Sequence, residues 1–248
     1  MTTNEVTAAK ISTPCTRQCR LVGGVRCYGC GRTWQQIKEW QKTDCLKYDR
    51  QSEIVKPQYV VEKLYELTGG DAFICSDVGQ HQMWAAQFYK FNKPRRWINS
   101  GGLGTMGVGL PYAMGIKKAF PNEEVCTITG EGSIQMCSQE LSTCLQYDTP
   151  IKIISLNNRY LGMVRQWQQM FFEKRYASTE LVNPDFVTIA KGYYLEAEKV
   201  SERKNLKEAV NRMIKSKKPY FLEVSVEKED NVFPMIPTGA SVSDIRLE

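Results

Sequence analysis

The chain has 248 residues, of which 42% are hydrophobic and 24% are charged, and its formal net charge at pH 7 is +6. A chain of this length can bury a full core and form one or two domains, while its scattered positive charge excludes the clustered arginines and aromatics of a nucleic-acid binding surface. No apolar run approaches the roughly 20 residues that span a bilayer, and residues 1–12 lack an apolar secretory core, so we expect a cytoplasmic protein that binds neither nucleic acid nor membranes.

A cysteine-rich segment at residues 13–42 is the first feature along the chain, after a tail (1–12) that we expect to be disordered. Its four clustered cysteines are Cys15, Cys19, Cys27 and Cys30. Their spacing, C-x3-C followed by C-x2-C, is typical of a tetrahedral zinc site, with an iron-sulfur cluster or no metal as the alternatives. Disulfides are disfavoured in a reducing compartment. The wording PCxxxC and CxGCGRT resembles a small cysteine-rich family of unknown activity.

Helix and strand patterns alternate in the rest of the chain. Pro57 opens a helix that Gly69 ends. Short apolar, β-branched runs are typical of buried parallel strands, and they occur at 72–76, 125–129, 151–156 and 220–226. A later helix is expected to start at Asn205, with Glu208 completing a capping box. We therefore expect residues 45–248 to form one α/β domain with a doubly wound parallel sheet.

Two polar motifs follow neighbouring strands of this predicted sheet. Gly130-Glu131-Gly132-Ser133 comes directly after the run 125–129, and Asn158 ends the run that starts at residue 151. A right-handed crossover brings both strand ends to one edge, where Glu131 and Asn158 can converge. We expect a helix to start just after Ser133, so that free amides of Gly132 and Ser133 suit a diphosphate while the two side-chain oxygens suit Mg²⁺. The alternative is an exposed loop and an Asn-Asn turn.

The wording around these motifs resembles the thiamine diphosphate enzymes, and in particular the catalytic subunit of acetolactate (acetohydroxyacid) synthase. The matching stretches are residues 76–87, 95–115, 129–150, 156–168 and 232–248. The resemblance implies that residues 45–248 carry the diphosphate-binding domain of that family. It also implies a transferase that uses thiamine diphosphate and Mg²⁺ to decarboxylate pyruvate and to join the remaining carbons to a second 2-keto acid, in branched-chain amino acid biosynthesis.

The resemblance also implies roles for single residues. Glu131, Asn158 and the backbone carbonyl of Tyr160 correspond to the metal ligands, although the wider family mostly has Asp where this chain has Glu131. Trp167 corresponds to the residue that recognises the second keto acid, with a packed core indole as the alternative. The residues that correspond to cofactor contacts are Gln80, His81, Gly104, Met106, Gly130, Gly132, Ser133, Asn158 and Met163.

Some parts of the family's enzyme have no counterpart in this sequence. The family activates its cofactor with a glutamate on a pyrimidine-binding domain, and nothing before Cys45 resembles that domain or the FAD-binding middle domain. We therefore expect no catalytic residue in this chain and expect the activating glutamate to come from elsewhere. As partners we expect a homo-oligomer or a complementing chain with the pyrimidine-binding domain. A regulatory subunit is a further partner that the family implies. The alternative is a non-catalytic cofactor-binding, metal-binding or interaction module, from a fusion joined near residues 40–45.

Overall fold

The computed structural model describes residues 21–22, 26–27, 46–236, 239 and 246, and the chain divides into two compact units. The smaller unit combines Met1–Lys47 with Val232–Glu248, and the larger one is Tyr48–Asn231. In the smaller unit, β1 (Leu21–Val22) pairs antiparallel with β2 (Arg26–Cys27). Apart from the backbone of Cys27, the four clustered cysteines and the expected junction lie outside the described residues, so the zinc site stays a prediction.

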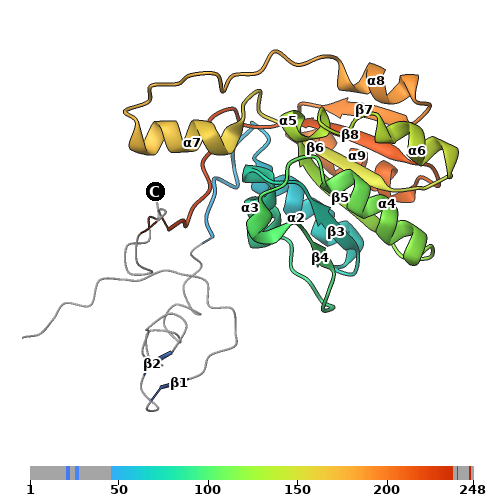
Figure 1. The fold of residues 1–248 in the computed structure, drawn as a ribbon, viewed down its shortest axis with the longest axis horizontal. Helices are drawn as coiled ribbons and strands as arrows, with labels where there is room; N and C mark the ends of the chain where they lie inside the picture. Colours follow the sequence, from blue (N-terminus) through green and yellow to red (C-terminus); the bar gives the residue numbers. More distant parts are fainter. Residues whose placement is uncertain (1–20, 23–25, 28–45, 237–238, 240–245, 247–248) are drawn as a thin grey trace, which may run out of the picture. The chain divides into compact units, whose positions relative to one another are not determined.

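A six-stranded sheet forms the centre of the larger unit (Figure 1). Its strand order is β4-β3-β5-β6-β8-β7, and every neighbouring pair is parallel. The strands are β3 (Phe73–Ser76), β4 (Trp97–Ile98), β5 (Val125–Gly130), β6 (Lys152–Asn157), β7 (Glu196–Val200) and β8 (Tyr220–Ser225). The predicted doubly wound parallel sheet is therefore confirmed. The sequence analysis did not predict the edge strands β4 and β7, because β4 is very short and β7 is mostly polar.

Helices cover both faces of the sheet (Figure 1). On one face, α4 (Gly109–Ala119), α6 (Glu140–Gln146) and α8 (Phe186–Gly192) pack on alternate strand residues such as Phe73 and Ile153. The other face is covered by α2 (Pro57–Thr68), α3 (Gln80–Phe88) and α9 (Arg203–Lys215). The free cysteines of the described core are Cys75, Cys126, Cys137 and Cys144. Within the described ranges, no helix is long and apolar enough to cross a membrane.

Two predicted helix starts differ from the structure. The helix expected after Ser133 begins earlier, as the short α5 (Glu131–Ile134), and is separated from α6 by turns with i→i+3 hydrogen bonds, for example from the Glu140 amide to the Cys137 carbonyl. Apolar spacing does not distinguish these tight turns from an α-helix. The expected capping box is wrong, because α9 begins at Arg203 with Glu202 as its N-cap. Glu202 is held extended there by a bridge to Ile54.

The connections of the sheet create one position suited to a ligand. From β3 the chain passes through α3 to β4, whereas from β5 it passes through α5 and α6 to β6 on the opposite side. Since β3 and β5 are neighbours, the loops leaving their carboxyl ends diverge, and ligands bind at such points in open parallel sheets. Beyond β6, α7 (Gly162–Phe171) stands clear of the covering helices, and a long loop returns the chain to α8 (Figure 1).

Candidate functional site

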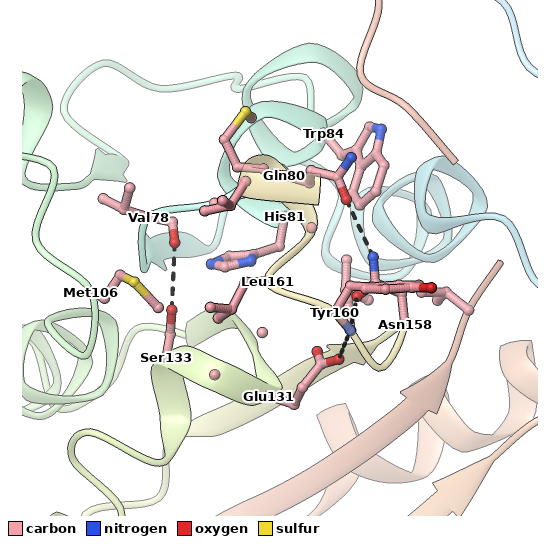
Figure 2. Close-up of a pocket in the computed structure, with 18 residues that line it drawn as sticks. Val78, Gln80, His81, Trp84, Met106, Glu131, Ser133, Asn158, Tyr160 and Leu161 are labelled. Atoms are coloured by element: carbon pink, nitrogen blue, oxygen red, sulfur yellow. Dashed lines mark hydrogen bonds between the residues drawn. The ribbon is translucent and has the colours of Figure 1, made fainter. Parts of the chain in front are cut away.

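A pocket lies at the carboxyl ends of β3, β5 and β6 and encloses about 560 Å³, its open mouth included. Figure 2 shows His81 and Leu161 in its middle, with Met106 and Ser133 on one side and Asn158 and Tyr160 on the other. The predicted site residues that line it are Gln80, His81, Met106, Gly130, Glu131, Gly132, Ser133, Asn158, Tyr160 and Met163. The structure therefore brings together residues that are far apart in sequence, while their individual roles stay predictions.

The two proposed metal ligands converge on one backbone amide. The Tyr160 N–H donates to Glu131 Oε1 at 3.0 Å and to Asn158 Oδ1 at 3.1 Å. Because the carboxylate oxygen and the amide oxygen share one donor, both lie within reach of a single cation. Glu131 starts α5, and Asn158 directly follows β6, so the strand-helix-strand crossover produces the convergence expected from the sequence.

Glu131 is a buried acid without a cationic hydrogen-bond partner among the described residues. Its side chain is only 1% exposed. Burial raises the pKa of its carboxyl to about 7, and hydrogen bonds from the backbone at Glu131, Tyr160 and Arg159 offset this only in part. A buried carboxylate is stabilised when a metal ion coordinates it. In the described part of the chain no three His, Cys, Asp or Glu side chains gather, so a cation here would rely on Glu131 together with amide and carbonyl oxygens.

Gln80 connects Asn158 to the wall of the pocket. Its Oε1 accepts a hydrogen bond from Asn158 Nδ2 at 3.2 Å, and its Nε2 donates to Gln166 Oε1 and to the Asp230 carbonyl, both at 2.9 Å. Gly162 makes this approach possible, since a Cβ there would lie 2.1 Å from Gln80 Oε1. The orientation of Asn158 is therefore fixed by neighbours from α3 and α7.

His81 presents an unpaired nitrogen in the pocket. The residue is buried, and its Nε2 has no hydrogen-bond partner among the described residues. Burial lowers the pKa of the imidazole to about 4, against the effect of a hydrogen bond to the backbone of Asp77. The ring lies close to the glycine of β5, because a Cβ on Gly130 would be 2.9 Å from His81 Nδ1. A buried nitrogen without a partner fits a ligand with hydrogen-bonding oxygens.

The short helix α5 provides the opposite wall. The amides of Gly132 and Ser133 belong to its first turn, where backbone N–H groups have no acceptor within the helix. Gly132 allows close packing, since a Cβ there would lie 2.7 Å from Leu161 Cδ2 and 3.7 Å from Met106 Cε. The Ser133 hydroxyl donates to the Val78 carbonyl at 3.4 Å. This wall thus combines polar amides with an apolar contact from Met106 and Leu161.

The loop after β6 is shaped by contacts that sequence patterns did not reveal. Asn157 Oδ1 accepts from the Arg159 amide at 3.1 Å, and Arg159 has a positive φ of 62°. The Leu161 amide donates to the Thr179 carbonyl, and the Leu181 amide to the Arg159 carbonyl, both at 2.8 Å. Further residues line the pocket to which the sequence analysis assigned no single role, namely Val78, Gly79, Trp84, Leu156, Leu161, Gly162, Val164 and Val226. Except for Trp84 in α3, they lie at or soon after the carboxyl end of a strand, which is their main sequence signal.

Two predicted site residues lie outside the pocket. Gly104 is exposed and ends the 3₁₀ turn η1 (Gly101–Leu103) in a left-handed conformation, with φ of 62°. Trp167 lies on α7 and lines a separate shallow groove with Val164 and Phe172. Its ring packs on Phe171 with 5.0 Å between the centroids. In this structure neither residue contributes to the pocket lining.

Comparison with known proteins gives relatives for most of the chain. Residues 77–224 match the family described as "Thiamine pyrophosphate enzyme, C-terminal TPP binding domain". The Escherichia coli (strain K12) protein "Acetolactate synthase isozyme 3 large subunit" is 49% identical over 218 residues, which are 86% of this chain and 38% of that protein. "Acetolactate synthase 1, chloroplastic" of Zea mays is 41% identical over 225 residues, 87% of this chain and 35% of that protein. The chain thus spans well under half the length of these relatives.

The cysteine-rich region has a match of its own. Residues 13–55 match the family described as "Protein of unknown function (DUF1289)", which confirms the resemblance of this segment to a small uncharacterised family. That description carries no activity, so it adds no ligand or partner to the segment.

Proposed function

The chain belongs to the thiamine pyrophosphate enzymes through their C-terminal TPP-binding domain, and from this premise we propose that it binds thiamine diphosphate and Mg²⁺ as the diphosphate-side part of an acetolactate synthase. The observation that carries the proposal is the convergence of Glu131 and Asn158 on the Tyr160 amide, beside the unpaired Nε2 of His81. The identity of 49% to an acetolactate synthase large subunit supports the choice of reaction.

The residues of the pocket fit this cofactor. Glu131 Oε1, Asn158 Oδ1 and the Tyr160 carbonyl would hold Mg²⁺, which prefers hard oxygen ligands shared with phosphate. The amides of Gly132 and Ser133 would bind diphosphate oxygens, with His81 Nε2 as an additional hydrogen-bonding group. Met106 would pack against the apolar part of the cofactor. Bound metal would also stabilise the ionised form of Glu131, whose pKa burial alone raises to about 7.

We propose that the reaction joins two small 2-keto acids. Thiamine diphosphate supplies an electron sink for the decarboxylation of the first keto acid and for transfer of the remaining carbons to the second. The protein's own contribution is to fix the metal and the diphosphate and to exclude water with Trp84, Leu161 and Val226, which line the pocket. Recognition of the second keto acid by Trp167 is part of this proposal, and in the present structure this residue lies in the neighbouring groove.

We also propose that a complementing chain with a pyrimidine-binding domain completes the site, within an oligomer that contains this chain. The relatives from Escherichia coli and Haemophilus influenzae are named large subunits, which supports assembly with other chains as part of the proposal. That zinc binds the cysteine-rich segment, and that FAD and a regulatory subunit belong to the complete enzyme, stay predictions from the sequence.

Calorimetry of the full chain tests the cofactor proposal. We expect thiamine diphosphate to bind in the presence of Mg²⁺, and we expect chelation of the metal to abolish this binding. Glu131→Ala should weaken Mg²⁺-dependent binding by on the order of 100-fold, since metal-site residues contribute at least this much to affinity. Glu140→Ala on α6 is the matched control and should bind as the wild type does. Unchanged Mg²⁺-dependent affinity in Glu131→Ala would contradict the assignment.

Formation of acetolactate from pyruvate tests the reaction. The assay compares the full chain alone with the chain plus candidate partners that carry a pyrimidine-binding domain. Activity only in the mixture would support a complementing chain, whereas tight cofactor binding without any activity would favour a non-catalytic module. Activity of the chain alone would contradict the need for a group from another chain.

A further inference from the structure

A second buried carboxylate, that of Asp77, stands directly behind the pocket. Asp77 follows β3 and is 0% exposed. Its Oδ1 accepts a hydrogen bond from the amide of Gly109, the first residue of α4, at 2.6 Å. Its Oδ2 accepts from the hydroxyl of Thr129, near the end of β5. One side chain therefore joins the ends of two strands to the start of a helix.

Backbone amides satisfy this carboxylate. The amides of Gly107 and Val108 also hydrogen bond to it, and these bonds oppose the rise in the pKa of Asp77 that burial causes. The amino end of α4 carries the positive end of the helix dipole, which stabilises a negative charge placed there. Asp77 is thus held by the same segment that it anchors, and none of the roles proposed above uses it.

The anchored segment, residues 104–109, carries Met106 into the pocket. At Gly107 and Gly109 the segment lies close to its neighbours. A Cβ on Gly107, where φ is +81°, would lie 3.0 Å from Met136 Cβ, and one on Gly109 would lie 2.9 Å from the Asp77 amide. On the pocket side, Met106 Cε is 3.7 Å from the position that a Cβ of Gly132 would take. A shift of this segment would therefore move Met106 relative to α5.

We propose that Asp77 is the positioning residue that fixes residues 104–109 against the ends of β3 and β5, and thereby places Met106 over Gly132. The inference rests on the proposed function of the pocket as a thiamine diphosphate site. His81 shares this anchor, because its ring hydrogen bonds to the backbone of Asp77. Asp77 thus connects three parts of the pocket, namely the start of α3, the segment 104–109 and the end of β5, without lining the pocket itself.

Amide hydrogen exchange of the ligand-free full chain tests the anchor without relying on the cofactor. In Asp77→Ala we expect peptides covering residues 101–112 to exchange about ten-fold faster or more, because the amides that donate to the carboxylate lose a charged acceptor. The same variant should bind thiamine diphosphate with Mg²⁺ about ten-fold more weakly. Asp77→Asn should change both quantities less, since its amide oxygen still accepts from Gly109 and the Thr129 hydroxyl can turn to the Gly130 carbonyl at 3.2 Å.

Asp185→Ala is the matched control. Asp185 caps α8 by accepting from the Thr188 amide at 3.0 Å, so this variant also loses an aspartate at a helix start, but at a position that is not part of the pocket lining. Wild-type exchange of residues 101–112 in Asp77→Ala, or equal acceleration there in Asp185→Ala, would overturn the proposal.

Thr129→Val provides a second variant in case Asp77→Ala does not fold. It removes the hydroxyl that donates to Asp77 Oδ2 and keeps a β-branched residue in β5, so the exchange of residues 101–112 should still accelerate. Unchanged exchange in Thr129→Val would overturn the proposal as well. If the wild type binds no thiamine diphosphate, the proposed function fails, whereas the exchange comparison still decides whether Asp77 anchors the segment.

Discussion

Two buried charged groups lie at opposite ends of the β5-β6 pair, and they differ in how they are satisfied. At the amino end of β6, the Lys152 side chain is 2% exposed and its Nζ donates to the carbonyls of Ser216 and Lys218 at 2.8 and 3.0 Å. At the carboxyl end, Glu131 accepts from the Tyr160 amide and has no cation beside it among the described residues. The ammonium at one edge is thus paired with two acceptors, while the acid at the other edge is only partly stabilised.

The difference indicates which edge is built for a ligand. Burial lowers the pKa of Lys152 and raises that of Glu131, so both groups carry a desolvation penalty. Carbonyls of the loop between α9 and β8 offset the penalty at Lys152, which makes this residue part of the fold. The protein's own groups offset it only partly at Glu131, and a bound cation would supply the rest. The predictions below test this contrast, starting with the largest expected effect.

The largest effect is expected for Glu131→Gln in metal-free protein. Between about pH 4.5 and pH 7 the folded state keeps a proton on Glu131 that the unfolded chain has released, so the free energy of unfolding falls as pH rises through this range. A shift of this size corresponds to about 3 kcal/mol. Glu131→Gln removes the penalty, so urea unfolding at pH 8 with chelator should show the variant to be more stable than the wild type by about this amount.

The metal dependence gives the control for this prediction. Near pH 4 the two proteins should be equally stable, because Glu131 is protonated in the folded and unfolded states. Adding Mg²⁺ at pH 8 should stabilise the wild type and leave Glu131→Gln unchanged, since binding to the folded state alone raises the free energy of unfolding. Equal stabilities of the two metal-free proteins at pH 8 would show that Glu131 is already satisfied by its own neighbours.

A smaller effect, with the opposite sign, is expected for Lys152→Met. The substitution removes the donor of two part-buried hydrogen bonds, those to the carbonyls of Ser216 and Lys218, which should lower the free energy of unfolding by about 2 kcal/mol. The affinity for thiamine diphosphate with Mg²⁺ should not change, because Lys152 lies at the other end of β6. Urea unfolding and calorimetry measure the two quantities.

Lys204→Met is the control for that prediction. Its side chain is 79% exposed and pairs with Glu202, and exposed ion pairs contribute little to stability. A Lys152→Met protein as stable as this control would mean that the two carbonyls find other donors. The structural role of Lys152, on which the contrast with Glu131 depends, would then be wrong.

The same contrast separates what the sequence could predict from what it could not. The buried strands β5 and β6 follow from short β-branched runs, and the convergence of Glu131 with Asn158 follows from the handedness of the crossover between them. These two predictions need only local sequence patterns and the general rule that such crossovers are right-handed. The hydrogen bond from Gln80 to the Asp230 carbonyl and the pairing of Leu161 with Thr179 rest on contacts between distant segments that have no periodic pattern.

Local patterns also fail where several conformations share one apolar spacing. Leu145 continues the apolar three-and-four spacing of residues 134, 137, 141 and 144, but it is 46% exposed on α6. Trp167 lines a groove beside the pocket, and its role towards the second keto acid, which the resemblance implies, stays a prediction. The polar edge strand β7 carries no apolar run to predict it. Sequence thus predicted the central strands and the pocket better than the segments that surround them.

The smallest effect concerns His81, which is the only histidine of the chain. Burial lowers its pKa to about 4, so the folded state stays neutral where the unfolded chain binds a proton, and the free energy of unfolding falls as pH drops below about 6.5. This slope opposes that of Glu131. At pH 6 the loss in the free energy of unfolding is less than about 1 kcal/mol, so an NMR titration of the imidazole resonance is the better measurement. Because the chain has a single histidine, this resonance needs no assignment by mutation.

In the metal-free, cofactor-free protein the titration midpoint of His81 should lie near pH 4. Thiamine diphosphate with Mg²⁺ should move it upward, because an anionic oxygen beside Nε2 favours the protonated imidazole. Lys152→Met should leave the midpoint in place, since its altered site lies at the far end of β6. A midpoint near 6.5 without ligand would show that the imidazole is hydrated. Of the two buried groups at the pocket edge, only Glu131 would then lack full stabilisation by the protein.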